Sequence, residues 1–186
     1  MPVNKTMRIT GGSLVRRRFL VPPMVDEGTV RPTPDRVREA VFSMLFNRLP
    51  NALVVDLFAG SGAHGYEAIS RGAKEITFVE KDPKVSAIIQ KNIAALGLNS
   101  QCKVVVADCL DFLAKEKFMA DIIFVDPPYT ITLDEDFFNN LLSHLLPDGV
   151  VIFRCFKKEE PKLGDGFFID IDRSYAGTRV FVLKRK

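Results

Sequence analysis

The feature that most constrains this chain is an alternation of short apolar runs with segments of helical periodicity. The apolar runs are strand-sized and lie at 53–58, 75–80, 103–107, 121–126 and 150–155. The segments with helical spacing or helix-capping residues lie at 65–70, 82–97, 109–115 and 134–146. Strands that are separated by helices pair in parallel, because a parallel connection needs a long crossover. The pattern predicts an α/β fold: a doubly wound, mainly parallel sheet with helices on both faces.

The C-terminal part of the chain departs from this alternation. Residues 167–172 and 179–184 are two extended runs with Gly177 between them and no helix. Two strands joined by so short a connection can pair only as an antiparallel hairpin. We therefore expect a seven-stranded sheet that ends in this hairpin.

The N-terminal part departs from it too. Residues 7–21 contain two short extended runs around Gly11-Gly12, which predicts a small β-hairpin. A proline-rich loop follows, and Thr33-Pro34 is a typical start of a helix, which we expect to run to about Arg48. The chain is therefore divided into an N-terminal extension, 1–32, and a main domain, 33–186.

The formal charge of +3 is unevenly distributed. Residues 5–38 contain eight basic side chains and three acidic ones, and the basic ones include Arg16, Arg17 and Arg18. A basic arm on a slightly acidic body suits binding to a phosphate backbone. A solvated basic surface would explain the same charges equally well.

Composition excludes several other classes of protein. The longest apolar runs are far too short to cross a bilayer, and the first residues lack the order of a secretory signal. Cys102, Cys109 and Cys155 are odd in number and have no metal-ligand spacing, so we expect them to be buried or half-buried thiols and expect no metal site. These features favour a cytoplasmic protein.

A glycine-rich loop follows the first apolar run. Gly60, Gly62 and Gly65 form a GxGxxG pattern between a predicted strand and a predicted helix, which is the context that nucleotide binding requires. Glu80 ends the second strand, where a carboxylate can accept hydrogen bonds from ribose hydroxyls. The loop alone does not distinguish a dinucleotide from S-adenosylmethionine.

Two further acids favour S-adenosylmethionine. Asp56 lies just before the loop, where a carboxylate would repel a pyrophosphate but attract the ammonium of a methionine. Asp108 ends the third strand, where it can accept from an adenine amino group, although it could instead cap the following helix. Acids at the ends of three successive strands indicate a ligand site, because ligands bind beyond the carboxyl ends of such sheets.

The most specific motif is Asp126-Pro127-Pro128-Tyr129, which follows the fourth strand. The prolines stiffen the turn and remove two backbone donors, Asp126 adds a carboxylate acceptor, and Tyr129 adds a flat face for a base. Two acceptors that hold the hydrogens of a conjugated amine can aim its lone pair at a sulfonium methyl group. The motif therefore predicts methyl transfer to an exocyclic amine of a nucleic-acid base.

With these motifs the chain resembles the RsmD family, bacterial methyltransferases that act on the N2 amine of a guanine in 16S ribosomal RNA. The resemblance is carried by 8–12, 31–39, 56–62 and 126–129. It implies the Rossmann-like fold of class I S-adenosylmethionine-dependent methyltransferases and a 30S subunit or assembly intermediate as substrate. We also expect a monomer.

The resemblance also implies roles for individual residues. Cofactor contacts are expected at Asp56, Gly60, Gly62, Glu80 and Asp108. Catalysis is expected from Asp126, Pro127 and Tyr129, base contacts from Pro128 and Tyr129, and RNA contacts from Arg16, Arg17 and Arg18. His64 departs from the family pattern, in which an aliphatic residue is expected. A contact of His64 with the cofactor is an alternative, but we interpret this residue as a surface residue at a helix start. We interpret His144 as structural or solvent-facing.

Four other functions remain open from the residues alone. The same tetrapeptide serves adenine-N6 and cytosine-N4 DNA methyltransferases, although no extra domain for reading DNA is evident. A protein-glutamine methyltransferase would usually carry Asn in place of Asp126. A non-catalytic RNA-binding assembly factor and an NAD-dependent dehydrogenase complete the alternatives.

Overall fold

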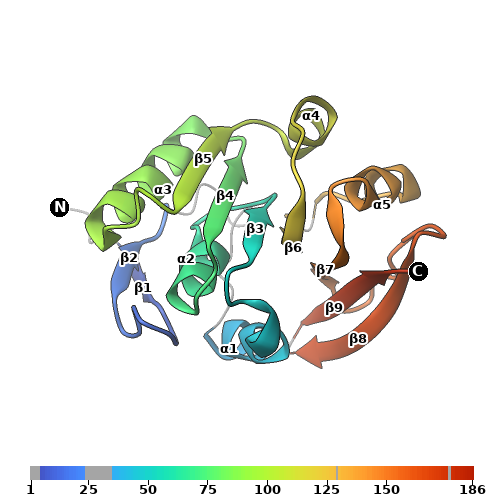
Figure 1. The fold of residues 1–186 in the computed structure, drawn as a ribbon, viewed down its shortest axis with the longest axis horizontal. Helices are drawn as coiled ribbons and strands as arrows, with labels where there is room; N and C mark the ends of the chain where they lie inside the picture. The colour runs from blue at the N-terminus through green and yellow to red at the C-terminus, as the bar shows by residue number, and fades with distance from the viewer. Residues whose placement is uncertain (1–4, 24–34, 129, 176) are drawn as a thin grey trace.

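The computed structural model describes residues 5–23, 35–128, 130–175 and 177–186, and its centre is one mixed sheet of seven strands (Figure 1). The strands are β3 (Leu53–Asp56), β4 (Glu75–Glu80), β5 (Cys102–Val106), β6 (Ala120–Val125), β7 (Leu145–Phe156), β8 (Phe167–Tyr175) and β9 (Thr178–Arg185). Their order across the sheet is β5-β4-β3-β6-β7-β9-β8. The pairs from β5 to β7 are parallel, and β9 is antiparallel to both β7 and β8. The predicted sheet and its terminal hairpin are confirmed.

The central strands are rich in apolar residues because both of their faces are buried. On one face lie Val54, Ile76 and Ile122, and on the other lie Val55, Val79 and Ile123. Successive side chains of a strand point to opposite faces, so adjacent residues contribute to two separate cores.

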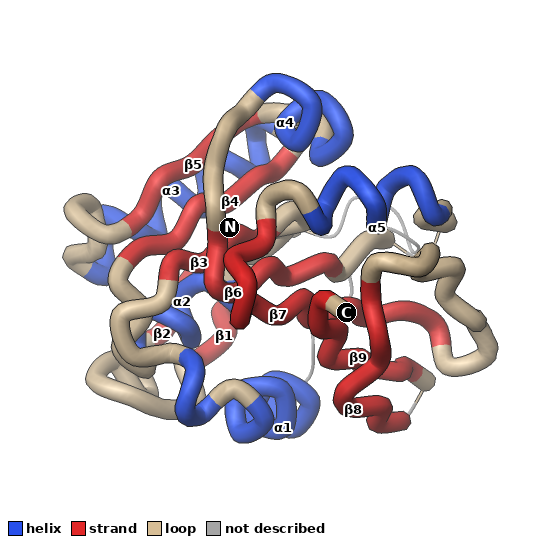
Figure 2. The backbone as a smooth tube through the Cα atoms, turned by 45° about the vertical axis from the view of Figure 1, so that its right-hand side comes forward, coloured by secondary structure: helices blue, strands red, loops and turns tan. Residues whose placement is uncertain are grey.

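Five α-helices cover these two faces among the described residues: α1 (Asp35–Met44), α2 (Ala63–Ser70), α3 (Pro83–Leu96), α4 (Cys109–Lys115) and α5 (Glu135–Leu142). Helices α1, α2 and α3 pack on the face of Val54, and α4 and α5 pack on the face of Val55. Figure 2 shows α4 and α5 above the strands and α1 below them. Helices on both faces are the arrangement that the sequence predicts.

The N-terminal hairpin, β1 (Thr6–Arg8) and β2 (Arg18–Leu20), joins the same layer as α2 and α3. The Asn92 side chain on α3 accepts from the Leu20 amide at 2.8 Å and donates to the Leu20 carbonyl at 2.9 Å, so it completes the edge of β2. Phe19 is buried against Tyr66 of α2, with ring centroids 4.9 Å apart. The predicted hairpin is therefore confirmed, and it is packed onto the main domain.

Three predicted boundaries are wrong. The helix that was expected over 134–146 ends at Leu142. The first helix ends at Met44, and a 3-10 turn over Phe46–Arg48 follows it. Strand β7 begins at Leu145, so Pro147-Asp148-Gly149 lies inside a strand and not in a turn before one. The pairing of β6 with β7 shifts from Ala120↔Leu145 to Ile122↔Val150. The extra residues of β7 at this point form an irregularity in the ladder.

A buried ion network attaches α1 to α2 and to the hairpin. The side chain of Arg38 is fully buried; its Nη2 donates to the Arg8 carbonyl at 2.7 Å and to Asp35 at 3.0 Å, and its Nε lies 3.5 Å from Glu67 Oε1. Glu67 also accepts from the Thr10 amide at 2.7 Å and from Arg71. One buried carboxylate on α2 therefore contacts both of the elements that precede the sheet.

We expect Glu67→Ala to destabilise the protein by about 3 kcal/mol, because it removes one anionic partner of a buried guanidinium. Urea unfolding measures this change. The matched control is Glu39→Ala, which removes an exposed carboxylate from α1. Equal stability of the two variants would show that the network does not hold these elements together.

Candidate active site

The order of the strands reverses between β3 and β6, which lie side by side at the centre of the sheet. The two helices that follow these strands lie on opposite faces, and ligands of open α/β sheets bind at the carboxyl ends of the strands at such a switch point. Asp56 ends β3, Asp126 follows β6, Glu80 ends β4 and Asp108 lies two residues after the end of β5. The structure therefore places the four predicted acids at one edge of the sheet, which we call the carboxyl edge.

The glycine loop after β3 is held by Glu80. Its Oε2 accepts from the Gly60 amide at 2.9 Å and its Oε1 from the Asp82 amide at 3.0 Å. Gly60 and Gly62 have φ angles of 51° and 78°, a left-handed conformation that favours glycine. A carboxylate oxygen has two acceptor sites, so Glu80 can brace the loop and still accept from a hydroxyl.

Gly65 has a different function, in helix packing. A Cβ atom at this position would lie 2.1 Å from Cε1 of Phe78 on β4, so only glycine allows α2 to pack this close to the sheet. The N-terminus of α2 is thereby held against the carboxyl edge.

Asp56 is the unusual group of this edge. It is fully buried, and neither carboxylate oxygen has a hydrogen-bond partner among the residues that the structure describes. Burial, and then the negative charge of Asp126, raise the pKa of Asp56 to about 8. A buried carboxylate of this kind suits a positively charged ligand group, which would replace the missing partner.

His64 does not supply that positive charge. Its Nδ1 lies 3.9 Å from Asp56 Oδ2, and its ring stacks on Phe124 with centroids 4.9 Å apart. Burial lowers the pKa of His64 to about 4, so the ring is neutral at pH 7. The expectation that His64 lies on the surface is wrong: a ring that packs on Phe124 replaces the aliphatic side chain that was expected.

Asp126 is held by a residue that the sequence analysis did not identify. Nε and Nη2 of Arg154, on β7, donate to its two carboxylate oxygens, both at 2.6 Å. The only sequence signal for this partner is a lone basic residue inside an apolar strand. The tetrapeptide continues through Pro127 to Pro128, whose carbonyl accepts from the Ile131 amide at 2.9 Å. Tyr129 lies outside the described residues, so its predicted stacking function stays a prediction.

Asp108 is exposed and caps α4, because its Oδ1 accepts from the Leu110 amide at 2.9 Å. The alternative of a helix cap is therefore confirmed. A carboxylate oxygen still accepts a second hydrogen bond, so the cap and a contact to a ligand are compatible.

The structure does not bring Arg16, Arg17 and Arg18 to the carboxyl edge. Arg17 donates to the carbonyl of Ala95 in the last turn of α3, and Arg18 donates to Thr6 within the hairpin. The first turn of α3 follows Glu80, and a helix of 14 residues is about 21 Å long. These arginines therefore lie at the opposite end of α3 from the predicted site.

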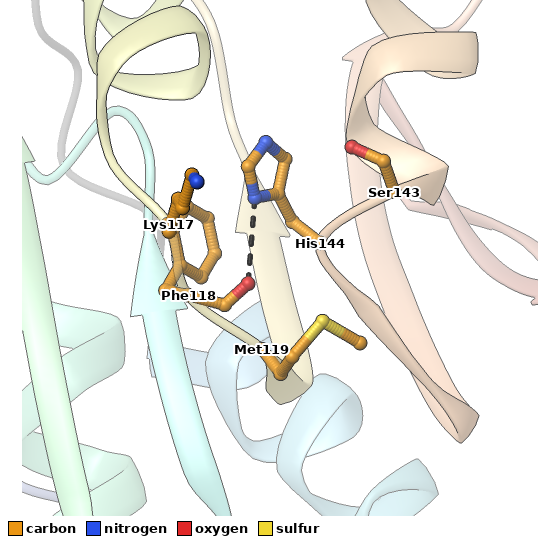
Figure 3. A pocket seen from close by; sticks show the side chains of 5 residues that line it. All are labelled: Lys117, Phe118, Met119, Ser143 and His144. Atoms are coloured by element: carbon orange, nitrogen blue, oxygen red, sulfur yellow. Dashed lines mark hydrogen bonds between the residues drawn. The ribbon is translucent and has the colours of Figure 1, made fainter.

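Two hollows among the described residues lie away from the carboxyl edge. One of about 580 Å³ is lined by Gly12, Ser13, Phe46, Asn47, Pro50 and residues 69–72. The other, of about 570 Å³, lies at the amino end of β6 and is lined by Lys117, Phe118, Met119, Ser143 and His144 (Figure 3). His144 is buried there, stacks on Phe118 and lies 3.0 Å from the Leu113 carbonyl, so its structural interpretation is confirmed. The described residues form no cluster of metal-ligating side chains and no helix long and apolar enough to span a membrane.

The cysteines agree with their predicted environment. Cys109 and Cys155 are buried and Cys102 is half-buried, and all three are free thiols. Burial raises the pKa of each thiol, to about 11 for Cys109 and about 12 for Cys102 and Cys155. None of them is a nucleophile at neutral pH.

Strand order, the glycine loop at the switch point and the acids of the carboxyl edge define a Rossmann-like methyltransferase domain. A solved Escherichia coli structure described as a candidate methyltransferase, yhhF, superposes with a TM-score of 0.85 at 31% identity and covers 98% of this chain and 99% of its own. The family model described as "Conserved hypothetical protein 95" matches residues 7–184. The chain belongs to this family, and the resemblance to the RsmD family is confirmed.

Two relatives carry a more specific name. The "Ribosomal RNA small subunit methyltransferase D" of Escherichia coli K12 is 42% identical over 148 residues, which cover 79% of this chain and 73% of the relative. The protein of the same name from Haemophilus influenzae is 36% identical over 159 residues, with 83% and 81% covered. This chain is therefore a methyltransferase.

The buried carboxylate gives a prediction about stability in the absence of cofactor. The pKa of Asp56 is about 8 in the folded protein, against an ordinary value of 3.8, so the folded state holds an extra proton between about pH 4 and pH 8. The contribution of Asp56 to the free energy of unfolding of the parent therefore falls as pH rises through this window. Asp56→Asn abolishes this dependence, so its stability relative to the parent should increase with pH and level off above about pH 8.

Urea unfolding at about pH 5, 6.5 and 8.5 tests this expectation. Asp111→Asn, at an exposed site on α4, controls for the loss of one negative charge. A stability difference between Asp56→Asn and the parent that does not vary with pH would contradict the prediction.

Proposed function

We propose that this protein uses S-adenosylmethionine to methylate the exocyclic N2 amine of a guanine in 16S rRNA of the small ribosomal subunit, as a cytoplasmic monomer. The observation that carries the proposal is that Asp56, a buried carboxyl group without a hydrogen-bond partner among the described residues, lies across the switch point from the carboxylate of Asp126. The names of the relatives support the ribosomal substrate.

The residues of the carboxyl edge fit S-adenosylmethionine. Asp56 has no hydrogen-bond partner among the residues that the structure describes, and the ammonium of the methionine part supplies one. Gly60 and Gly62 keep side chains away from the ligand, and Glu80 accepts from ribose hydroxyls while it braces the loop. Asp108 accepts from the adenine amino group. A dinucleotide fits less well, because its pyrophosphate would lie near Asp56.

Asp126 and the carbonyl of Pro127 hold the hydrogens of the guanine amine, and Tyr129 and Pro128 contact the base. When bound, S-adenosylmethionine supplies a sulfonium methyl group: the amine lone pair forms the N–C bond, the C–S electron pair returns to sulfur, and the amine loses one proton to solvent. The protein contributes position and a negative charge beside the nitrogen as it becomes positive.

The N-terminal extension, residues 1–32, contacts the RNA backbone. Arg16, Arg17 and Arg18 lie away from the carboxyl edge, so they serve phosphates and not the target base. A large folded RNA can contact both places at once.

The test of the activity is transfer of label from S-adenosylmethionine to 30S subunits from a strain that lacks this modification. We expect label in 16S rRNA, recovered as N2-methylguanosine after digestion to nucleosides. Tyr129→Ala should lower kcat about 100-fold, because the base loses its stacking surface and its position. Label on adenine or cytosine, or no label on any ribosomal substrate, would overturn the proposal.

The RNA arm is tested separately. Replacing Arg16, Arg17 and Arg18 with Ala should weaken binding to 30S subunits at least about tenfold at moderate salt. The slope of log affinity against log salt should become shallower by about 1 for each phosphate that the variant no longer binds. Cofactor affinity should stay unchanged.

The control removes the same charge from the exposed Lys157, Lys158 and Lys162. If the arginine variant and this lysine variant bind the subunits equally well, the arm is not the RNA site.

A further inference from the structure

Arg154 is placed by the sheet directly beside Asp126. Val125 of β6 pairs with Phe153 of β7, so the next residue on each strand continues the same register. Successive side chains alternate between faces, and both residues follow one that points into the core of α4 and α5. Asp126 and Arg154 therefore point to the opposite face, where α2 and His64 lie.

The contact between them is a two-point ion pair in a sheltered place. Nε donates to Oδ1 and Nη2 to Oδ2, both at 2.6 Å, and the side chains are only 14% and 12% exposed. A guanidinium that binds both oxygens fixes the plane of the carboxylate, which a single contact does not. Each oxygen has a second acceptor site, so Asp126 can still receive the hydrogens of an amine.

The ion pair also offsets negative charge at the carboxyl edge. Asp56 and Asp126 are close enough for the charge of Asp126 to raise the pKa of Asp56. His64 is neutral and cannot offset these two carboxylates. Arg154 supplies a positive charge beside Asp126, so that the acceptor next to the cofactor site is an ion pair without net charge.

We propose that Arg154 is a positioning residue for methyl transfer: it orients the carboxylate of Asp126 toward the amine and offsets its charge. This inference rests on the proposed function. It makes the Asp126–Arg154 pair equivalent to a neutral acceptor such as the amide of Asn, which has an oxygen of fixed orientation and needs no counter-charge.

Lysine is not equivalent to arginine at this position. An ammonium is a point charge on a flexible stem, and it cannot bind both oxygens in a fixed plane. Arg154→Lys keeps the charge and should fold, yet we expect kcat to fall about tenfold. Arg154→Met, which loses both charge and geometry, should lower kcat about 10- to 100-fold. The KM for RNA and the cofactor affinity should change less than about twofold in both.

The decisive comparison is a double variant. If Arg154 acts through Asp126, then Asp126→Asn combined with Arg154→Met restores a neutral, oriented acceptor. Its kcat should exceed that of Arg154→Met alone by about tenfold. A purely structural function of Arg154 predicts no such rescue, because Asp126→Asn would add a second loss.

The matched control is Arg179→Met on β9. Arg179 also donates through Nε and Nη2 to one carboxylate, Asp172, at 2.9 and 2.6 Å, but on the hairpin at the far edge of the sheet. We expect its kcat to equal that of the parent.

The outcomes separate this inference from the proposed function. A parent protein that does not methylate 30S subunits overturns the proposed function. A parent that is active, with Arg154→Lys and Arg154→Met equally active, overturns only the inference. An inactive Arg154→Met that Asp126→Asn does not rescue also overturns it, provided that thermal unfolding shows both variants to be folded.

Discussion

The structure depends on the reversal of strand order between β3 and β6. At this point the chain leaves β3 toward α2, on one face of the sheet, and leaves β6 toward α5, on the other. In open α/β sheets, ligands bind beyond the carboxyl ends of the strands at such a switch point. Asp56 and Asp126 occupy these positions. The position of each acid follows from strand pairing, and the pairing is held by two apolar cores, one on each face.

The electrostatics of the site follow from this arrangement. Two carboxylates that lie close together in a buried environment repel each other. This repulsion is reduced in a different way at each of them. Asp126 is paired with Arg154, while Asp56 has no hydrogen-bond partner among the described residues and holds a proton at neutral pH. The site therefore combines an acceptor of fixed orientation with a nearby carboxyl group that has no hydrogen-bond partner among the described residues. These two features are what the proposed methyl transfer from S-adenosylmethionine requires.

Much of this could be predicted from residues alone, and the reasons are local. Strand-sized apolar runs with helices between them predicted the sheet, and acids at the ends of these runs predicted the carboxyl edge. The errors have equally local causes. Pro147-Asp148-Gly149 is a typical turn sequence, but the ladder of β6 and β7 holds it as an irregularity in one long strand. His64 looked like a polar residue at a helix start, and its stacking on Phe124 depends on a strand that is 60 residues away in sequence.

The amino-acid sequence by itself determined the class of fold, the order of its elements and the edge of the sheet at which the acidic residues gather. It could do so because hydrophobic periodicity, glycine conformation and proline stiffness act over a few neighbouring residues. Only the tertiary structure decided which side chains meet at that edge. The pairing of Arg154 with Asp126, the missing partner of Asp56, and the distance of the basic hairpin from the site depend on strand register and on packing between distant segments. Register and packing are set by the whole sheet at once, and no local pattern encodes them.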